Sequence, residues 1–93
     1  MTSVNAGEVL YITLRECGEK TLAEVERILH TLPITIVDAD MAIVREAVRL
    51  KAFRKMSYAD CIAAALGRMK GAAVVTGDPE FHAVEKLIKI KWL

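Results

Sequence analysis

Hydrophobic positions along the chain follow a helical period in four segments, where apolar residues recur every three or four positions. Each segment opens with a polar residue that can accept a hydrogen bond from the first turn, which is how helices usually begin. The sequence therefore predicts four helices with a short polar connection before each one. The predicted N-caps are Asn5, Thr21, Asp40 and Ser57, and the predicted stops are Gly18, Pro33 and Gly71.

Three further segments have an extended rather than a helical pattern. Residues 34–37 and 72–76 are small or β-branched throughout and are bounded by Pro, Gly or Asp, which predicts two buried strands. Residues 87–93 alternate Ile and Trp with lysine, which is typical of a strand at a sheet edge. Asp78 and Pro79 predict the start of a short helix before it. Strands alternating with helices predict an α/β fold, a mostly parallel sheet flanked by helices, in one domain over residues 1–93.

The composition limits the class of protein. With 93 residues and 54% apolar residues, the chain is rich in hydrophobic side chains for its size, and we expect part of that surplus to contact another polypeptide. A net charge of +1 excludes a strongly cationic arm but allows a local basic face. Cys17 and Cys61 are isolated, so we expect reduced thiols packed as small hydrophobes. We find no signal peptide and no apolar run long enough for a membrane, and expect a cytoplasmic protein.

Several acidic residues follow predicted strands or open predicted helices. In an open parallel sheet the ligand site lies beyond the carboxyl ends of the strands, where Asp78 lies and where the first turns bearing Glu8 and Asp60 are expected. Each acid is also a plausible helix cap, worth about 0.5–2 kcal/mol, and for Asp38 and Asp40 we favour that interpretation. Carboxylates about 4 Å apart repel by roughly 4 kcal/mol at an effective dielectric constant of 20, so a cluster would need a cation.

Three segments together resemble one family. Residues 2–9 (TSVNAGEV), 56–65 (MSYADCIAAA) and 74–81 (VVTGDPEF) occur in the order and approximate spacing of PIN-domain nucleases. They look most like the VapC toxins of toxin–antitoxin pairs. The combination of the last two segments is specific, whereas either alone would be moderate support, and the resemblance continues to residues 88–93.

The resemblance implies a three-layer PIN-like fold and hydrolysis of RNA with Mg²⁺ or Mn²⁺. It implies Glu8, Asp60 and Asp78 as metal ligands and catalytic acids, with Thr76 orienting water or a carboxylate. It also implies an RNA substrate, an antitoxin protein as partner and a homo-oligomer. Candidate phosphate contacts, each also a plausible solvated surface charge, are Arg15, Arg45, Arg49, Lys51, Arg54, Lys55 and Arg68.

The sequence departs from the family at its beginning. Family members start with a strand that bears a first acid, and the matching segments here begin after it, so we expect an N-terminally truncated PIN domain with weakened activity. The open strand edges left by that strand are a second reason to expect a homo-oligomer. The alternative is an inactive PIN remnant that serves as a protein-interaction module. A phosphate-binding regulator is disfavoured because the chain has no Gly-rich phosphate loop.

Overall fold

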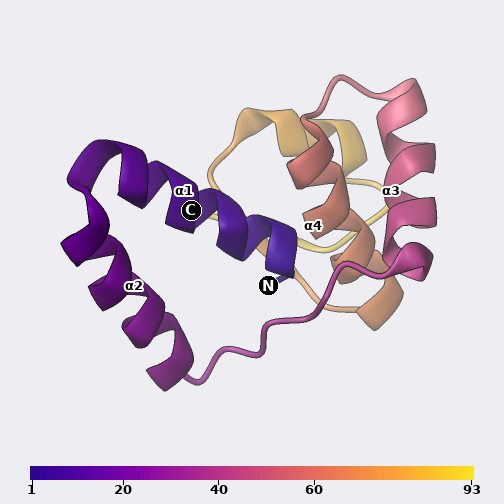
Figure 1. The fold of residues 1–93 in the computed structure, drawn as a ribbon. Helices are drawn as coiled ribbons and strands as arrows, with labels where there is room; N and C mark the ends of the chain where they lie inside the picture. The colour runs from indigo at the N-terminus through magenta and orange to yellow at the C-terminus, as the bar shows by residue number, and fades with distance from the viewer. The chain divides into compact units, whose positions relative to one another are not determined.

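The computed structural model describes residues 1–93, which divide into two compact units, Met1–Asp38 and Ala39–Leu93. The first unit contains two helices, and the second contains two helices, two strands and a 3₁₀ helix (Figure 1). None of the helices has both the length and the apolar character needed to cross a bilayer. The elements are α1 (Ser3–Cys17), α2 (Glu19–Thr31), α3 (Met41–Phe53), α4 (Tyr58–Lys70), β1 (Val74–Thr76), η1 (Pro79–Val84) and β2 (Ile90–Trp92).

In the first unit, α1 and α2 form a helical hairpin with a single connecting residue. Gly18 ends α1 and precedes α2 with φ 86°, a backbone conformation that glycine adopts without a Cβ clash. The predicted cap Asn5 is wrong, because Thr2 caps α1 and its hydroxyl accepts a hydrogen bond from the Asn5 N–H at 3.2 Å. The predicted cap Thr21 is also wrong, since α2 already begins at Glu19. The one-residue turn leaves no room for a separate side-chain cap.

Residues 34–37 do not form the buried strand that their β-branched side chains predict. Val37 makes only an isolated parallel bridge with Thr2, and the four residues are exposed or half-buried. The Val37 N–H donates to the Met1 carbonyl at 2.9 Å, and the Val37 carbonyl accepts from the Ser3 N–H at 2.9 Å. β-branched residues favour a strand chiefly because they pack against neighbouring strands and a covering layer. In this segment only Val37 pairs with another residue, so no strand forms.

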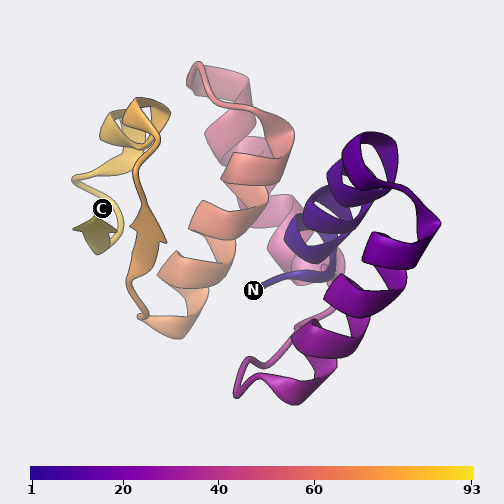
Figure 2. The same cartoon turned by 90° about the vertical axis from the view of Figure 1, so that its left-hand side faces the viewer.

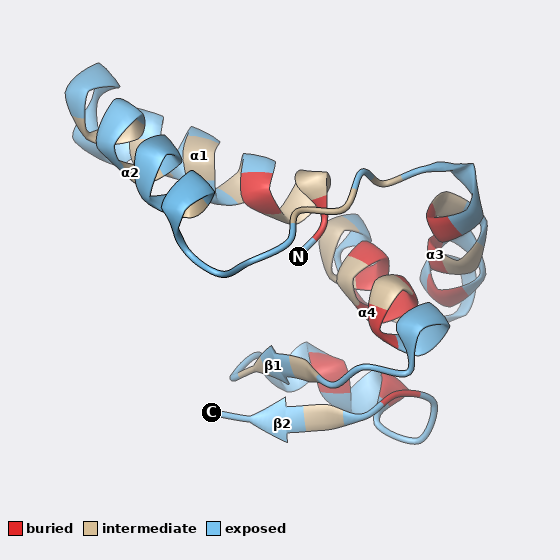
Figure 3. Cartoon of the chain, turned by 90° about the horizontal axis from the view of Figure 1, so that it is seen from below, coloured by how far each residue is buried: buried red, intermediate tan, exposed pale blue.

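In the second unit, α3 and α4 pack against each other (Figure 2). Ala47 on α3 and Ala64 and Ala65 on α4 are fully buried. On both helices the buried residues occupy only part of the surface (Figure 3). The predicted caps are confirmed, because Asp40 accepts from the Ile43 N–H and Ser57 from the Asp60 N–H. The first turns of both helices are thereby fixed by local sequence.

The sheet contains two parallel strands, β1 and β2, paired in the register Val74 with Ile90 and Thr76 with Trp92. Both strands are shorter than predicted, and β1 is half-buried to exposed rather than buried. Gly67 of α4 lies against β1, where a Cβ would come within 2.7 Å of the Val74 Cγ2. The α/β class with a parallel sheet and flanking helices is confirmed, although the sheet is small.

The two cysteines have different environments. Cys61 is fully buried in α4, as expected, and burial raises the pKa of its thiol, so it stays protonated and acts as a packing group. Cys17 is exposed at the end of α1, and the expectation that it packs inside is wrong. Both thiols are free.

Candidate metal centre

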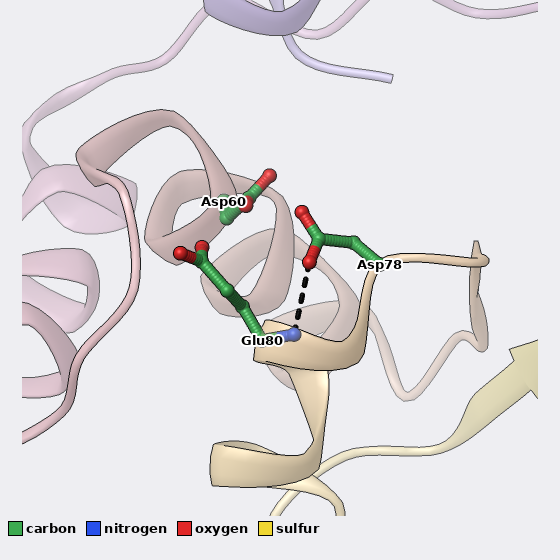
Figure 4. A group of neighbouring side chains, drawn as sticks. All are labelled: Asp60, Asp78 and Glu80. Atoms are coloured by element: carbon green, nitrogen blue, oxygen red, sulfur yellow. Dashed lines mark hydrogen bonds between the residues drawn. The ribbon is translucent and has the colours of Figure 1, made fainter.

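Three carboxylates of the second unit meet at the start of α4 and of η1. Asp60 lies in the first turn of α4, Asp78 is the N-cap of η1, and Glu80 lies in the first turn of η1. One oxygen from each lies within 4.8 Å of the others, and the side chains are turned toward one another (Figure 4). The structure thus brings together two predicted site residues, Asp60 and Asp78, and adds Glu80.

The end of β1 positions Asp78. The Thr76 hydroxyl accepts a hydrogen bond from the Asp78 N–H at 3.0 Å, which folds the chain back directly after the strand. Oδ1 of Asp78 in turn accepts from the Glu80 N–H at 2.9 Å (Figure 4). Asp78 is therefore a helix cap and a member of the cluster at the same time, so the two interpretations of this residue coexist.

Glu80 connects the cluster to the cap of α4. Its Oε2 accepts a hydrogen bond from the Ser57 N–H at 3.3 Å. In a capping box that N–H is satisfied by the acidic side chain three residues into the same helix, here Asp60. Because Glu80 accepts this hydrogen bond from a different element, the Asp60 carboxylate is not needed at the cap. Its side chain can instead face Asp78.

The carboxyl group of Asp60 is harder to ionise than that of an ordinary aspartate. Partial burial raises the pKa of the Asp60 carboxyl above its ordinary value, and the charges of Asp78 and Glu80 act in the same direction. A hydrogen bond with the Ser57 side chain opposes this shift without cancelling it. A raised pKa at a site that gathers further carboxylates is the pattern expected where a cation normally balances the charge.

The sequence did not identify Glu80 as a site residue. It was indistinguishable from an ordinary first-turn glutamate, which is favourable at the positive end of a helix dipole. The available signal was its spacing, since a residue two positions after the cap of a short helix lies at the same end as the cap. That spacing becomes informative only once Ser57 is known to lie beside η1.

The remaining predicted site residues are not members of this acidic cluster. Glu8 lies on α1 in the first unit and is half-buried, and its role as a ligand stays a prediction. In the second unit, two of the candidate RNA contacts have structural partners: Lys51 Nζ donates to the Met56 carbonyl at 2.7 Å, and Arg54 Nε to the Ala83 carbonyl at 3.2 Å. These bonds fix the connection between α3 and α4 and attach α3 to η1.

Carboxylate oxygens are the ligands that Mg²⁺ and Mn²⁺ prefer. Mg²⁺ commonly takes one or two protein carboxylates and completes its coordination with water and substrate oxygens. The donor set of Asp60, Asp78 and Glu80, all on one end of two neighbouring elements, fits such an ion. The arrangement offers the carboxylate oxygens that one divalent cation would need.

Comparisons with known proteins agree with this chemistry. Residues 1–87 match the family model of the PIN domain, which covers most of the 93-residue chain. A comparison with curated proteins gives no match.

Proposed function

Because the chain belongs to the PIN domain family, whose members are generally metal-dependent nucleases, we propose that it is an endoribonuclease using Mg²⁺ or Mn²⁺. The observation that carries the proposal is the cluster of Asp60, Asp78 and Glu80, whose oxygens lie within 4.8 Å of one another. The finer assignment that we propose is a VapC-like toxin, which acts on RNA and is neutralised by an antitoxin protein.

Each residue has a distinct part in the proposed site. Asp60 and Asp78 would hold the ion, and Glu8 stays a further ligand predicted from the sequence alone. The ion would supply the Lewis acidity that polarises a phosphate and lowers the pKa of a water. Glu80 adds a carboxylate and is the acceptor of the Ser57 N–H, so Asp60 is not needed for that hydrogen bond. Thr76 orients the segment that carries Asp78 through the bond to its N–H.

The test compares two Asp→Asn substitutions at helix caps, one inside the acidic cluster and one outside it. Asp78 and Asp40 are both N-caps that accept a backbone N–H, and asparagine caps helices about as well as aspartate. Asp78→Asn should therefore keep η1 intact and abolish cleavage of single-stranded RNA in Mn²⁺. Asp40→Asn, at the start of α3, should leave cleavage of the RNA unchanged.

Cleavage should also stop when EDTA removes the ion. Robust cleavage in EDTA, or equal cleavage by the two asparagine variants, would contradict the proposal. Circular dichroism of both variants checks that the comparison is between folded proteins.

The second candidate function is the inactive interaction module, and the many exposed hydrophobic side chains favour it, among them Phe53, Met41 and Val75. A remnant has no reason to bind a cation. Calorimetric titration of Mn²⁺ into the unsubstituted chain and into Asp78→Asn separates the two functions. Binding that is lost in the variant supports the nuclease, whereas no binding to either supports the module.

A further inference from the structure

An exposed pair of aromatic rings lies near the acidic cluster, and neither the metal site nor the core accounts for it. The rings of His82 and Trp92 are stacked, with centroids 4.4 Å apart and an angle of 27° between their planes. The Trp92 residue is 40% exposed and the His82 side chain 63% exposed. Both residues therefore keep part of their surface in contact with water.

The pair is held in place before anything binds. Nδ1 of His82 lies 2.9 Å from Oε2 of Glu85, a contact at the edge of the imidazole, while Trp92 contacts its face. Trp92 belongs to β2 and is paired with Thr76 of β1. Rings that are already ordered lose little conformational entropy when a flat ligand stacks on them.

The pair is also close to the acids. His82 lies in η1, two residues after Glu80, and Thr76, the register partner of Trp92, accepts the Asp78 N–H. Neighbouring strands are about 4.8 Å apart, so the backbone of Trp92 lies beside that of Thr76, whose hydroxyl accepts the Asp78 N–H.

The local charge suits a polyanion more than an apolar protein surface. Residues 86–93 contain three lysines and no acidic residue, and Lys86, Lys89 and Lys91 are all exposed. Lys91 precedes Trp92 in β2, and Lys89 comes directly before the strand, so their side chains do not share the face of Trp92. They would attract a nucleic-acid strand electrostatically rather than by stacking on a base. Proteins that bind single-stranded nucleic acid combine such basic segments with aromatic rings on which bases stack.

We propose that His82 and Trp92 form a stacking platform for one unpaired base of an RNA strand whose neighbouring phosphate lies at the acidic cluster. This proposal rests on the proposed ribonuclease function and adds to it a base-binding subsite. Stacking accepts any base, because every base has a π face, so the platform selects single-stranded over duplex RNA rather than a particular sequence.

Trp92 is the only tryptophan of the chain, so its fluorescence reports on the platform alone. The titration uses a short single-stranded RNA and, as control, a strand of equal length that lacks bases. Both are added in Ca²⁺, and the RNA is recovered afterwards to check its length. We expect the RNA to quench the fluorescence, while the abasic strand binds without quenching.

The variants separate stacking from support of the fold. His82→Ala should weaken RNA binding roughly tenfold and leave abasic-strand binding unchanged. Trp92→Phe, followed by anisotropy of a labelled RNA, should retain most of the affinity because it keeps a π face. Phe53→Ala removes an aromatic ring that is 85% exposed elsewhere in the same unit and should change neither affinity.

Equal quenching by both strands, or full affinity in a folded His82→Ala variant, would overturn the proposal and leave the rings as a surface for a protein partner. If His82→Ala does not fold, the comparison of RNA with abasic strand on the unsubstituted chain still decides. Quenching without cleavage in Mn²⁺ would contradict the ribonuclease and keep the platform. Cleavage without quenching would support the ribonuclease and contradict the platform.

Discussion

Asp60 is the residue at which the demands of folding and of metal binding conflict most directly. Its carboxylate is partly withdrawn from water and faces the carboxylates of Asp78 and Glu80. Like charges at this distance repel by about 1–4 kcal/mol, the lower value applying where water screens them. Without a cation the cluster therefore opposes folding, and with one it supports folding.

Substituting this residue should separate the two effects. We expect Asp60→Asn to raise the stability of the metal-free chain by about 0.5–1 kcal/mol, because one of three mutually repelling charges is removed. The same variant should lose the stabilisation that Mn²⁺ gives, which for a ligand at 100 times its Kd is about 2.7 kcal/mol. Thermal unfolding with and without Mn²⁺ measures both. A variant that is less stable than the parent without metal would show that the repulsion is unimportant.

The raised pKa of Asp60 also predicts how metal binding depends on pH. Burial, then the charges of Asp78 and Glu80, make the folded chain hold this proton at a higher pH than the unfolded chain does. The destabilisation is therefore fully present above the folded-state pKa and is relieved as the pH falls through it. Protons and Mn²⁺ compete for the same oxygens, so affinity should fall on acidification, beginning above the ordinary range for aspartate.

Calorimetric Mn²⁺ titrations across the acidic range measure this dependence. Asp40→Asn, which alters a carboxylate outside the cluster, should follow the same profile as the parent chain. An affinity that stays constant until the pH reaches the ordinary value for an aspartate would contradict the prediction.

At the scale of elements, the success of a prediction depended on how local its cause is. The caps Asp40 and Ser57 were predicted because each hydrogen bond is made within one turn of its own helix. The prediction of a strand at residues 34–37 was wrong, because a strand needs a neighbouring strand and a covering layer that its own sequence does not specify. Glu80 was missed for the same reason: its partner Ser57 is 23 residues away.

The close approach of α4 and β1 gives a prediction with an internal control. At Gly67 a Cβ would lie 2.7 Å from the Val74 Cγ2 and 3.3 Å from the Ala72 carbonyl, whereas at Gly7 in α1 it would meet nothing within 4 Å. Gly67→Ala should destabilise by about 1–3 kcal/mol through overpacking, less whatever it gains in helix propensity. Gly7→Ala should stabilise by about 0.5–1 kcal/mol.

Urea unfolding of the two variants measures the difference, since both gain the same methyl group. A stabilised Gly67→Ala chain would mean that Val74 moves aside without loss. β1 would then be held less tightly against α4 than the geometry indicates.

At the scale of the whole molecule, the chain covers its apolar surface incompletely. Helix α2 has no buried residue although Leu22, Val25 and Leu29 form one apolar stripe. In the second unit Phe53 is 85% and Val75 58% exposed. Burying apolar surface stabilises by about 25 cal/mol per Å², so exposure on this scale favours association.

The sheet leads to the same expectation. Two strands leave each with one unpaired edge, and a pair of strands alone is marginally stable in water. Val75 lies in the middle of β1, so its backbone N–H and carbonyl are available on the edge that β2 does not occupy. A second copy could pair with that edge and cover the exposed side chains at once, which is why we expect a homodimer or larger assembly.

Sedimentation equilibrium in dilute buffer tests this, and we expect a mass at least twice the 10.3 kDa of the chain. Val75→Lys places a charge on the exposed edge strand and should shift the equilibrium toward the single chain if β1 is part of the interface. Lys86→Ala, which changes an exposed lysine outside both strands, is the control and should leave the mass unchanged. A folded species of 10.3 kDa that is stable at every concentration would contradict the prediction, because the exposed surface would then be tolerated without a partner.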